Sequence, residues 1–256
     1  MNITDATSGT TLTEIAAGLF RISTPVPPAA MPGGFSFNQF LLVDDEPLLF
    51  HTGPRQLFPL TRKAVEQVLP PERLRWIAFS HFEADECGAL NDWLALAPQA
   101  QPLCSQLGAM VSVADIADRP PRGLADGETL RLGRHTLRWV DAPHVPHAME
   151  CGYLFDETDR TLFCGDLFSQ PGHDLPAVSD SIDAVWAPSE QMRQGFPYAP
   201  VRDAGPIVDR LARLEPQLLA CMHGSSYRGD GGALLRRLRD ALSSDASPPG
   251  IPTSRT

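Results

Sequence analysis

The segment Ser80–Gly88, which reads SHFEADECG, decides how this chain folds. It directly follows the apolar run Leu74–Phe79, where a buried strand is expected to end and a helix to begin. Four of its side chains can bind a metal ion: His81, Glu83, Asp85 and Glu86. Carboxylates this close repel one another, and burial raises their pKa values unless a cation holds them together. The segment therefore predicts a metal site, and a nitrogen ligand among oxygens suits iron or manganese better than a thiolate-rich zinc site does.

Composition narrows the class of protein. The chain has 256 residues, 43% of them hydrophobic, which suits one folded body with a packed core. Its formal net charge of -10 and the absence of a basic block argue against a nucleic-acid partner. No run approaches the ~18 apolar residues of a membrane span, and residues 1–13 show no secretion signal. Five irregularly spaced cysteines indicate reduced thiols. We therefore expect a cytoplasmic protein that binds neither nucleic acid nor membranes.

Prolines and glycines divide the chain into alternating strands and helices. The apolar spacing predicts strands at 19–23, 37–43, 47–50, 74–79, 102–104, 129–132, 135–140, 152–156, 160–164 and 217–222. It predicts helices at 57–69, 89–96, 105–117, 206–214 and 231–242. We expect one domain over 19–242, an N-terminal extension over 1–18 and a disordered tail over 243–256, which is rich in Ser and Pro.

Candidate ligands follow the ends of four well-separated apolar runs: His81, His144, Asp166 and His223. Strand ends gather at common edges in sheets packed between helices, so these side chains are expected to meet. The charges also balance, because four carboxylates at Glu83, Asp85, Glu86 and Asp166 carry -4 and two divalent ions carry +4. The pattern predicts a two-metal centre.

Four motifs carry a resemblance to a known family: His81–Asp85, Pro143–Pro146, Leu162–Asp166 and His223–Arg228. Together they resemble the di-iron site of the flavodiiron proteins, the branch of the metallo-β-lactamase superfamily that handles dioxygen and nitric oxide. Hydrolytic members usually show His-x-His-x-Asp-His, and Glu83 at the third position points to the di-iron branch instead. The resemblance implies an α/β (α+β) fold, a four-layer αββα metallo-β-lactamase sandwich.

The resemblance also implies the ligands. One iron is expected on His81, Glu83 and His144, the other on Asp85 and His223, with Asp166 bridging. Glu86 stands where the family usually has a histidine, and we include it as a candidate ligand. Residues with supporting roles are also predicted. His147 is expected as a hydrogen-bond donor beside the ligands or as merely exposed, with direct metal ligation as a further alternative. Tyr227 and Arg228 are expected as donors at the pocket rim, and four residues as an apolar wall or plain core: Phe82, Met149, Phe168 and Trp186.

The implied function is a non-haem di-iron protein that binds or reduces dioxygen or nitric oxide, as an oxygen sensor or an oxidoreductase. Flavodiiron proteins continue into a flavodoxin domain that this sequence lacks, so no bound flavin is expected. Electrons then come from an external flavoprotein or rubredoxin, and a homodimer is expected by analogy. Zinc or manganese could replace iron. The alternatives are a zinc-dependent hydrolase of thioesters, lactones or phosphodiesters, and a scaffold without metal. The gas, the electron donor and the choice between sensor and reductase stay open.

Overall fold

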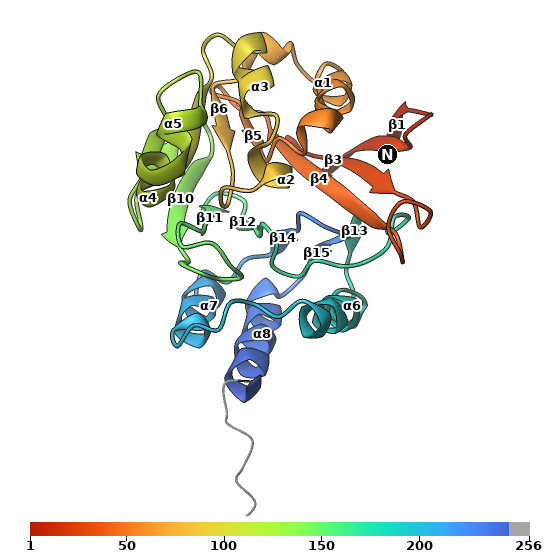
Figure 1. Ribbon diagram of the computed structural model, residues 1–256, viewed down its shortest axis with the longest axis vertical. Coiled ribbons are helices and arrows are strands. Elements are labelled where there is room, and N and C mark those ends of the chain that lie inside the picture. Colours follow the sequence, from red (N-terminus) through yellow and green to blue (C-terminus); the bar gives the residue numbers. More distant parts are fainter. Residues whose placement is uncertain (246–256) are drawn as a thin grey trace, which may run out of the picture.

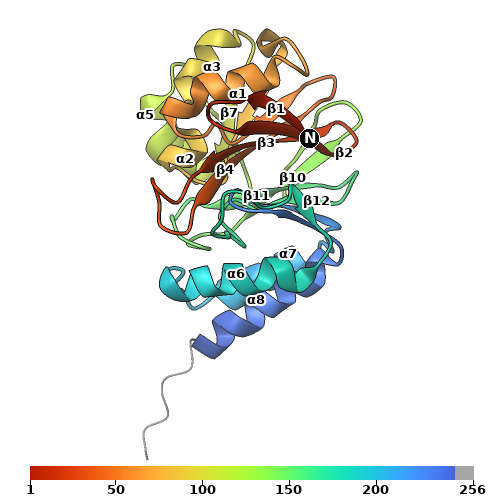
Figure 2. The ribbon, with the colours of Figure 1, turned by 90° about the vertical axis from the view of Figure 1, so that its right-hand side faces the viewer.

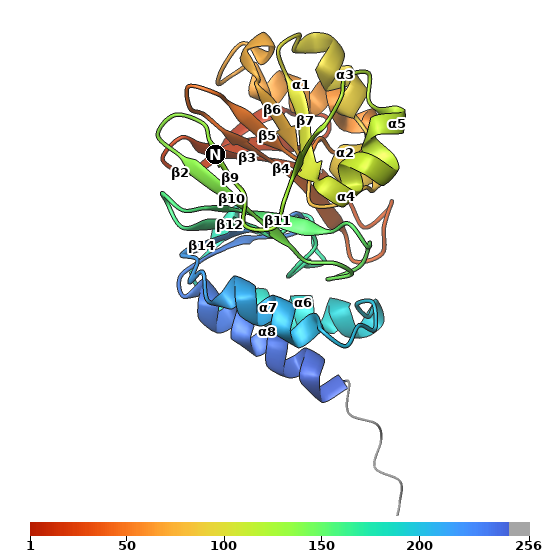
Figure 3. The same ribbon diagram turned by 90° about the vertical axis from the view of Figure 1, so that its left-hand side faces the viewer.

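The computed structural model describes residues 1–245 as two β-sheets packed face to face, with helices on both outer sides (Figure 1). Figure 2 shows the four layers in order, and Figure 3 shows them from the opposite side. The predicted αββα sandwich is confirmed. In the described part of the chain, no helix is long and apolar enough to cross a membrane.

The first sheet follows the chain from edge to edge. Its strands are β1 (Asn2–Asp5), β2 (Thr10–Ala16), β3 (Leu19–Val26), β4 (Phe35–Leu42), β5 (Leu48–Phe50), β6 (Trp76–Ala78), β7 (Gln101–Ser105) and β8 (Arg122–Leu124). Strands β1 to β5 pair antiparallel, and β5 to β8 pair parallel. Residues 1–18, expected as an extension of the domain, thus supply two strands of this sheet.

The second sheet is mixed, and the order of its strands differs from their order along the chain. Its strands run in the order β13 (Val178–Ser179), β15 (Ser226–Arg228), β14 (Leu218–Ala220), β12 (Thr161–Phe163), β11 (Gly152–Asp156), β10 (Thr136–Asp141) and β9 (Thr129–Arg131). The pairing of β12 with β14 is parallel, so their carboxyl ends meet at one edge. This register brings Asp166 and His223, which follow the two strands, to the same place.

The helices cover the outer faces. Above the first sheet lie α1 (Phe58–Val65), α2 (Ala84–Cys87), α3 (Leu90–Leu96), α4 (Gln106–Gly108) and α5 (Ala114–Ile116), with short turns at η1 (Arg55–Leu57), η2 (Pro71–Arg73) and η3 (Ala109–Val113). Below the second lie α6 (Ile182–Gly195), α7 (Ala204–Ala212) and α8 (Gly231–Asp245). The sequence did not predict α6, nor β13 and β15. The tail expected over 243–256 begins inside α8, and its residues from 246 lie outside the described part of the chain.

Apolar side chains fill three layers. Large aromatic residues such as Phe40, Phe50 and Phe163 pack between the sheets, with the rings of Phe50 and Phe163 centred 4.9 Å apart. Trp93 of α3 is buried against the outer face of the first sheet, and Leu234 of α8 against that of the second. Burial of this kind contributes ~25 cal/mol per Å² of apolar area, and it holds the sheets at a fixed spacing.

Polar contacts between the sheets fix the loop that follows β14. Asn38 of β4 donates from Nδ2 to the carbonyl oxygens of Cys221 and Gly224, at 2.9 Å each. Arg21 of β3 donates from Nη2 to the same Gly224 oxygen at 2.8 Å. All these groups are buried, so their hydrogen bonds are costly to break. The loop that carries His223 is therefore held to the first sheet.

Gly165 allows the end of β12 to pass close to the end of β6. Its φ is +48°, and a Cβ atom there would lie 2.7 Å from Ser80 Oγ and 2.8 Å from Ser80 Cβ. Contacts this short force a shift, and Ser80 directly precedes His81. Glycine is thus needed where two candidate ligands, His81 and Asp166, approach one another.

We expect Gly165→Ala to destabilise the protein by about 2–4 kcal/mol, because it combines backbone strain with overpacking against Ser80. Gly127→Ala is the matched control: its φ is +77°, but nothing lies within 4 Å of the added Cβ. It should cost only the ~1–2 kcal/mol of the left-handed conformation. Urea unfolding of both variants measures the difference. Equal losses would show that contact with Ser80 is unimportant.

Candidate metal centre

The candidate ligands come from both sheets and meet at one edge of the sandwich. His81 follows β6, while Asp85 and Glu86 lie in α2, with Glu83 directly before it. His147 lies in the loop between β10 and β11. Asp166 and His223 follow β12 and β14. The sequence predicts that separate strand ends share one site, and the structure brings both His81 and His223 close to Asp166.

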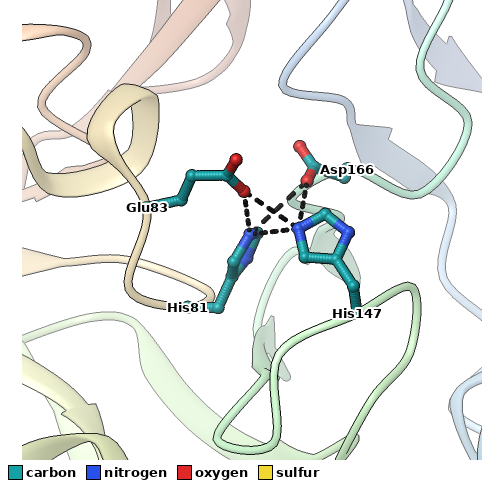
Figure 4. Close-up of side chains that lie close together, drawn as sticks. All are labelled: His81, Glu83, His147 and Asp166. Atoms are coloured by element: carbon teal, nitrogen blue, oxygen red, sulfur yellow. Dashed lines mark hydrogen bonds and ion pairs between the residues drawn. The ribbon is translucent and has the colours of Figure 1, made fainter. Parts of the chain in front are cut away.

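One group of ligand atoms surrounds His81 (Figure 4). His81 Nε2 lies 3.0 Å from Glu83 Oε2, 2.9 Å from His147 Nε2 and 3.5 Å from Asp166 Oδ2. His147 Nε2 is also 2.9 Å from Glu83 Oε2. One ligand atom from each of the four residues lies within 4.8 Å of the others. Two nitrogens and two carboxylate oxygens thus converge on a common point, as the ligands of a metal ion do.

A second group lies beside the first. His223 Nε2 is 3.4 Å from Asp85 Oδ2 and 3.3 Å from Asp166 Oδ1. Glu83, Asp85 and Glu86 also bring one oxygen each to within 4.8 Å of the others. Asp166 turns Oδ2 toward His81 and His147, and Oδ1 toward His223. This is the arrangement that a bridging carboxylate requires.

Hydrogen bonds behind His81 set its orientation. Its Nδ1 lies 3.0 Å from Ser80 Oγ, which lies 3.2 Å from His51 Nε2. His51 Nδ1 in turn lies 2.8 Å from the sulfur of Met222. Burial lowers the His51 pKa to about 3, so this ring is neutral. The thioether sulfur of Met222 can only accept, so His51 donates from Nδ1 and its Nε2 accepts from the Ser80 hydroxyl. The Ser80 oxygen in turn accepts from the Nδ1–H of His81. The lone pair of His81 Nε2 then faces the centre, as in metal-bound histidines.

His223 is oriented in the same way. Its Nδ1 donates to the backbone oxygen of Ser36 in β4 at 2.8 Å, which leaves Nε2 toward Asp85 and Asp166. The Phe35 ring stacks on the imidazole, with the ring centroids 4.2 Å apart. The first sheet therefore fixes a ligand that follows a strand of the second sheet.

The negative charges of the buried carboxylates require positive charge nearby to offset them. Burial, together with the charges of Asp166 and Asp85, raises the pKa of Glu86 well above its ordinary value. Glu86 is 0% exposed, and neither carboxylate oxygen has a hydrogen-bond partner. Burial would raise the Asp166 pKa too, but His223 and His81 outweigh it and hold that pKa below its ordinary range.

The raised pKa values of two histidines also reflect the negative charge of the site. Burial acts to lower the pKa of His223, yet Asp166 and Asp85 raise it to about 9. For His81 the opposing burial is outweighed by contacts with Cys151 and Glu83, which raise its pKa to about 11. Without a metal, protons on these rings offset the carboxylates. The Glu86 oxygens have no hydrogen-bond partner, and Oε1 lies 3.8 Å from His81 Nε2. Together with the converging lone pairs, they show that the residues present fit a pair of cations.

The structure corrects one predicted ligand. His147, and not His144, reaches the group around His81. The loop turns through hydrogen bonds from the His144 N–H to the Ala148 oxygen and from the Val145 N–H to the Ala142 oxygen. This turn places His147 against Glu83 and leaves His144 exposed. The family resemblance favoured His144 over His147, and the sequence does not reveal how the loop between them folds. Metal binding by each of the candidate ligands stays a prediction.

Tyr227 does not line the site. After Ser225 the chain reverses, and Tyr227 of β15 pairs with Leu219, so β15 runs away from the edge. Its buried ring packs in the core beneath the second sheet. Arg228 instead donates to the Ile15 oxygen. The expected donors at the rim are thus corrected, because the sequence did not predict β15.

A pocket of about 400 Å³ opens directly onto the ligands. Glu83, Asp85, His147, Asp166 and His223 form its polar side. The opposite side comes from α6 and the segment after it: Ser189, Met192, Arg193, Phe196, Pro197 and Tyr198. None of the four residues predicted as an apolar wall lines it; Phe82 and Met149 are exposed, and Phe168 and Trp186 pack below the second sheet.

Sequence reasoning missed this wall because it missed α6. The signals were present: Ser181 caps the helix by accepting from the Ala184 N–H, and Ile182, Val185 and Ser189 recur at helical spacing. Pro188 inside the helix disguised them, since an internal proline usually ends a helix.

Comparison with known proteins places the fold and site in a class. Solved structures that share the fold include a rubredoxin oxygen:oxidoreductase from Desulfovibrio gigas, with a TM-score of 0.78, 19% identity and coverage of 91% of this chain and 62% of that one. They also include a fragment, residues 1–254, described as "putative diflavin flavoprotein A 5" from Nostoc, with a TM-score of 0.75, 17% identity and coverage of 93% of this chain and 95% of that one. The architecture is that of the flavodiiron core with its metallo-β-lactamase fold.

Residues 35–224 match the family model described as ODP family beta lactamase, and the chain belongs to that family. The resemblance predicted from the sequence is confirmed. Similar curated proteins include a rubredoxin-oxygen oxidoreductase from Megalodesulfovibrio gigas, 27% identical over 77% of this chain, and a nitric oxide reductase from Moorella thermoacetica, 25% identical over 59%. A diflavin flavoprotein A 1 from Synechocystis is 24% identical over 82%. The chain spans 50%, 38% and 37% of their lengths.

We expect His147→Ala to bind less iron than His144→Ala after anaerobic reconstitution. Losing a direct ligand should weaken one site by more than the ~10–100-fold typical of outer hydrogen-bond partners, whereas exposed His144 should be replaceable without loss. Iron per protein, measured by mass spectrometry, should drop from about two to about one in His147→Ala. The reverse ranking would restore His144 as the ligand.

Glu86→Gln should change how the stability of the metal-free protein depends on pH. Because the Glu86 pKa is raised, folding favours its protonated form, and wild type loses stability relative to the variant as pH rises above the ordinary value of 4.5. The loss is at most about 1.4 kcal/mol per pH unit.

Glu83→Gln is the matched control for this experiment. The hydrogen bond from His81 lowers the Glu83 pKa, so the carboxylate contributes stability above 4.5 and the variant should lose it. Urea unfolding at several pH values measures both trends. Parallel profiles for wild type and Glu86→Gln would contradict the raised pKa.

Proposed function

We propose that this protein binds two iron ions and reduces dioxygen or nitric oxide with electrons from a separate donor. Its family and its relatives support the proposal, since two of them are named for oxygen and nitric oxide reduction. The observation that carries it is the pair of overlapping ligand groups that share Asp166 through different oxygens.

The chain supplies ligands for each ion. His81, Glu83 and His147 would hold one, Asp85, Glu86 and His223 the other, and Asp166 would bridge them. Imidazoles among carboxylates suit iron, and zinc or manganese are the competing ions. When bound, a pair of ferrous ions supplies two electrons and an open position for a diatomic gas.

The protein's own part is to hold these ligands without reorganisation. The chain of hydrogen bonds through Ser80 and His51 fixes His81, and the Ser36 carbonyl fixes His223. The carboxylates carry -4, which two divalent ions neutralise. A neutral site disfavours release of the ions, because either loss would leave buried charge uncompensated.

The electrons for gas reduction have to come from a donor other than the residues that hold the metal ions. The rubredoxin-oxygen oxidoreductase relative supports a rubredoxin as donor, and the diflavin relative supports a flavoprotein. The five cysteines, all within the part of the chain that the structure describes, are free and buried. Free thiols support a reducing compartment such as the cytoplasm. A homodimer that brings a donor near the irons stays a prediction.

Anaerobic reconstitution with ferrous iron, followed by mixing with dioxygen or nitric oxide, tests the proposal. We expect about two irons per chain, rapid oxidation of both by the gas, and sustained gas consumption once a rubredoxin and its reductase are added. Asp166→Asn should abolish consumption and lower the iron content. Reversible gas binding without consumption would point to a sensor. Two bound zinc ions with hydrolysis of a thioester, lactone or phosphodiester would point to a hydrolase, and no metal to a scaffold.

A further inference from the structure

The pocket over the ligands is larger than a diatomic gas needs. Its volume is about 400 Å³, whereas one water molecule occupies ~30 Å³ in the liquid, and dioxygen is of similar size. Pockets for small organic ligands span ~300–1,000 Å³. The space therefore fits an organic molecule of drug-fragment size beside the candidate metals.

Opposite sides of the pocket differ in chemistry. The ligand carboxylates and imidazoles lie on one side, and Phe35, Met192, Phe196 and Tyr198 present apolar surface to the same space. Phe35 connects the polar side of the pocket to the apolar side, because its ring stacks on the ligand His223. Phe196 is 74% exposed, although large apolar side chains are usually buried. A ligand with one oxygen-rich end and one apolar body matches this division.

The apolar wall is anchored to the metal side and is formed in advance. The Phe196 N–H donates to the Met192 oxygen at 2.8 Å, and the Ala199 N–H donates to the Pro146 oxygen at 2.7 Å in the loop that carries His147. The distance between the wall and the ligands is thus set by the fold.

Charge on the wall is already compensated. Arg193 lines the pocket, but its Nε and Nη2 each donate to a Glu190 carboxylate oxygen at 2.7 Å. With two divalent ions the ligand side is neutral as well. A neutral ligand is therefore favoured over an organic anion, which would have to compete with Glu190 for the guanidinium.

We infer that the pocket accepts a neutral organic hydroperoxide, whose O–O group meets the ligand side and whose apolar body lies against Met192 and Phe196. This inference rests on the proposed function, because it needs a reduced iron pair. The O–O bond would break on uptake of two electrons, one from each ferrous ion, and of two protons from two water molecules, which would leave as hydroxide ions. The hydroperoxide ROOH thus gives the alcohol ROH and one water molecule.

Binding is tested first on metal-free protein, with cumyl alcohol as an unreactive probe in ligand-observed NMR. We expect a dissociation constant of about 1 mM or tighter, as ~10 heavy atoms allow. Met192→Trp should weaken binding at least tenfold by filling the pocket. Gln191→Trp, its exposed neighbour on α6 that does not line the pocket, should bind like wild type. Phe196→Ala removes wall surface without overpacking, and it should weaken binding severalfold.

Reactivity is tested on the iron-loaded, reduced protein mixed anaerobically with cumene hydroperoxide or, separately, with dioxygen. The ratio of the two oxidation rates should fall at least tenfold in Met192→Trp and stay constant in Gln191→Trp, with one cumyl alcohol formed per two irons oxidised.

Two results would overturn the inference: no binding of cumyl alcohol, or equal behaviour of Met192→Trp and Gln191→Trp. Failure of the proposed function looks different, since iron would then not bind or dioxygen would not oxidise it. Cumyl alcohol would still report on the pocket of the metal-free protein in that case.

Discussion

Repulsion among four carboxylates is the constraint on which this structure depends. Glu83, Asp85, Glu86 and Asp166 meet at the edge of the sandwich, and Glu86 is fully buried with no hydrogen-bond partner. Such an arrangement is tolerated only where positive charge offsets it. Protonated imidazoles can do so without a metal, and two divalent ions can do so completely. The stability of this edge and its chemistry therefore have the same electrostatic origin.

The two sheets cooperate in holding the ligands. Ser36 and Asn38 of the first sheet bind His223 and the loop around it, although that loop follows a strand of the second sheet. His51, which follows β5, supports His81 through Ser80. The orientation of His223, and through Ser80 that of His81, thus depends on residues distant in sequence. Because these partners are buried, the ligand geometry changes only if the packing between the sheets changes.

The site separates two tasks in space. Loops at the strand ends supply the polar ligands, whereas α6 and the segment after it supply an apolar wall across the pocket. Met192 and Phe196 could vary without disturbing any candidate ligand. Such a division lets a common metal centre accept different molecules, because the wall decides which shapes reach it.

The sequence by itself indicated the sandwich through its resemblance to the flavodiiron family. It also indicated most residues of the candidate centre, because the SHFEADECG segment and the strand-end positions of Asp166 and His223 are local patterns. Most strands and helices were predicted for the same reason, since apolar spacing reflects which face is buried. Only the tertiary structure decided that His147, and not His144, lies beside His81. It also showed that Tyr227 lies away from the site and that α6 lies opposite the ligands. Those outcomes depend on how a loop turns and on which elements pack across a cavity. Contacts between residues distant in the chain set both, and no short stretch of sequence records them.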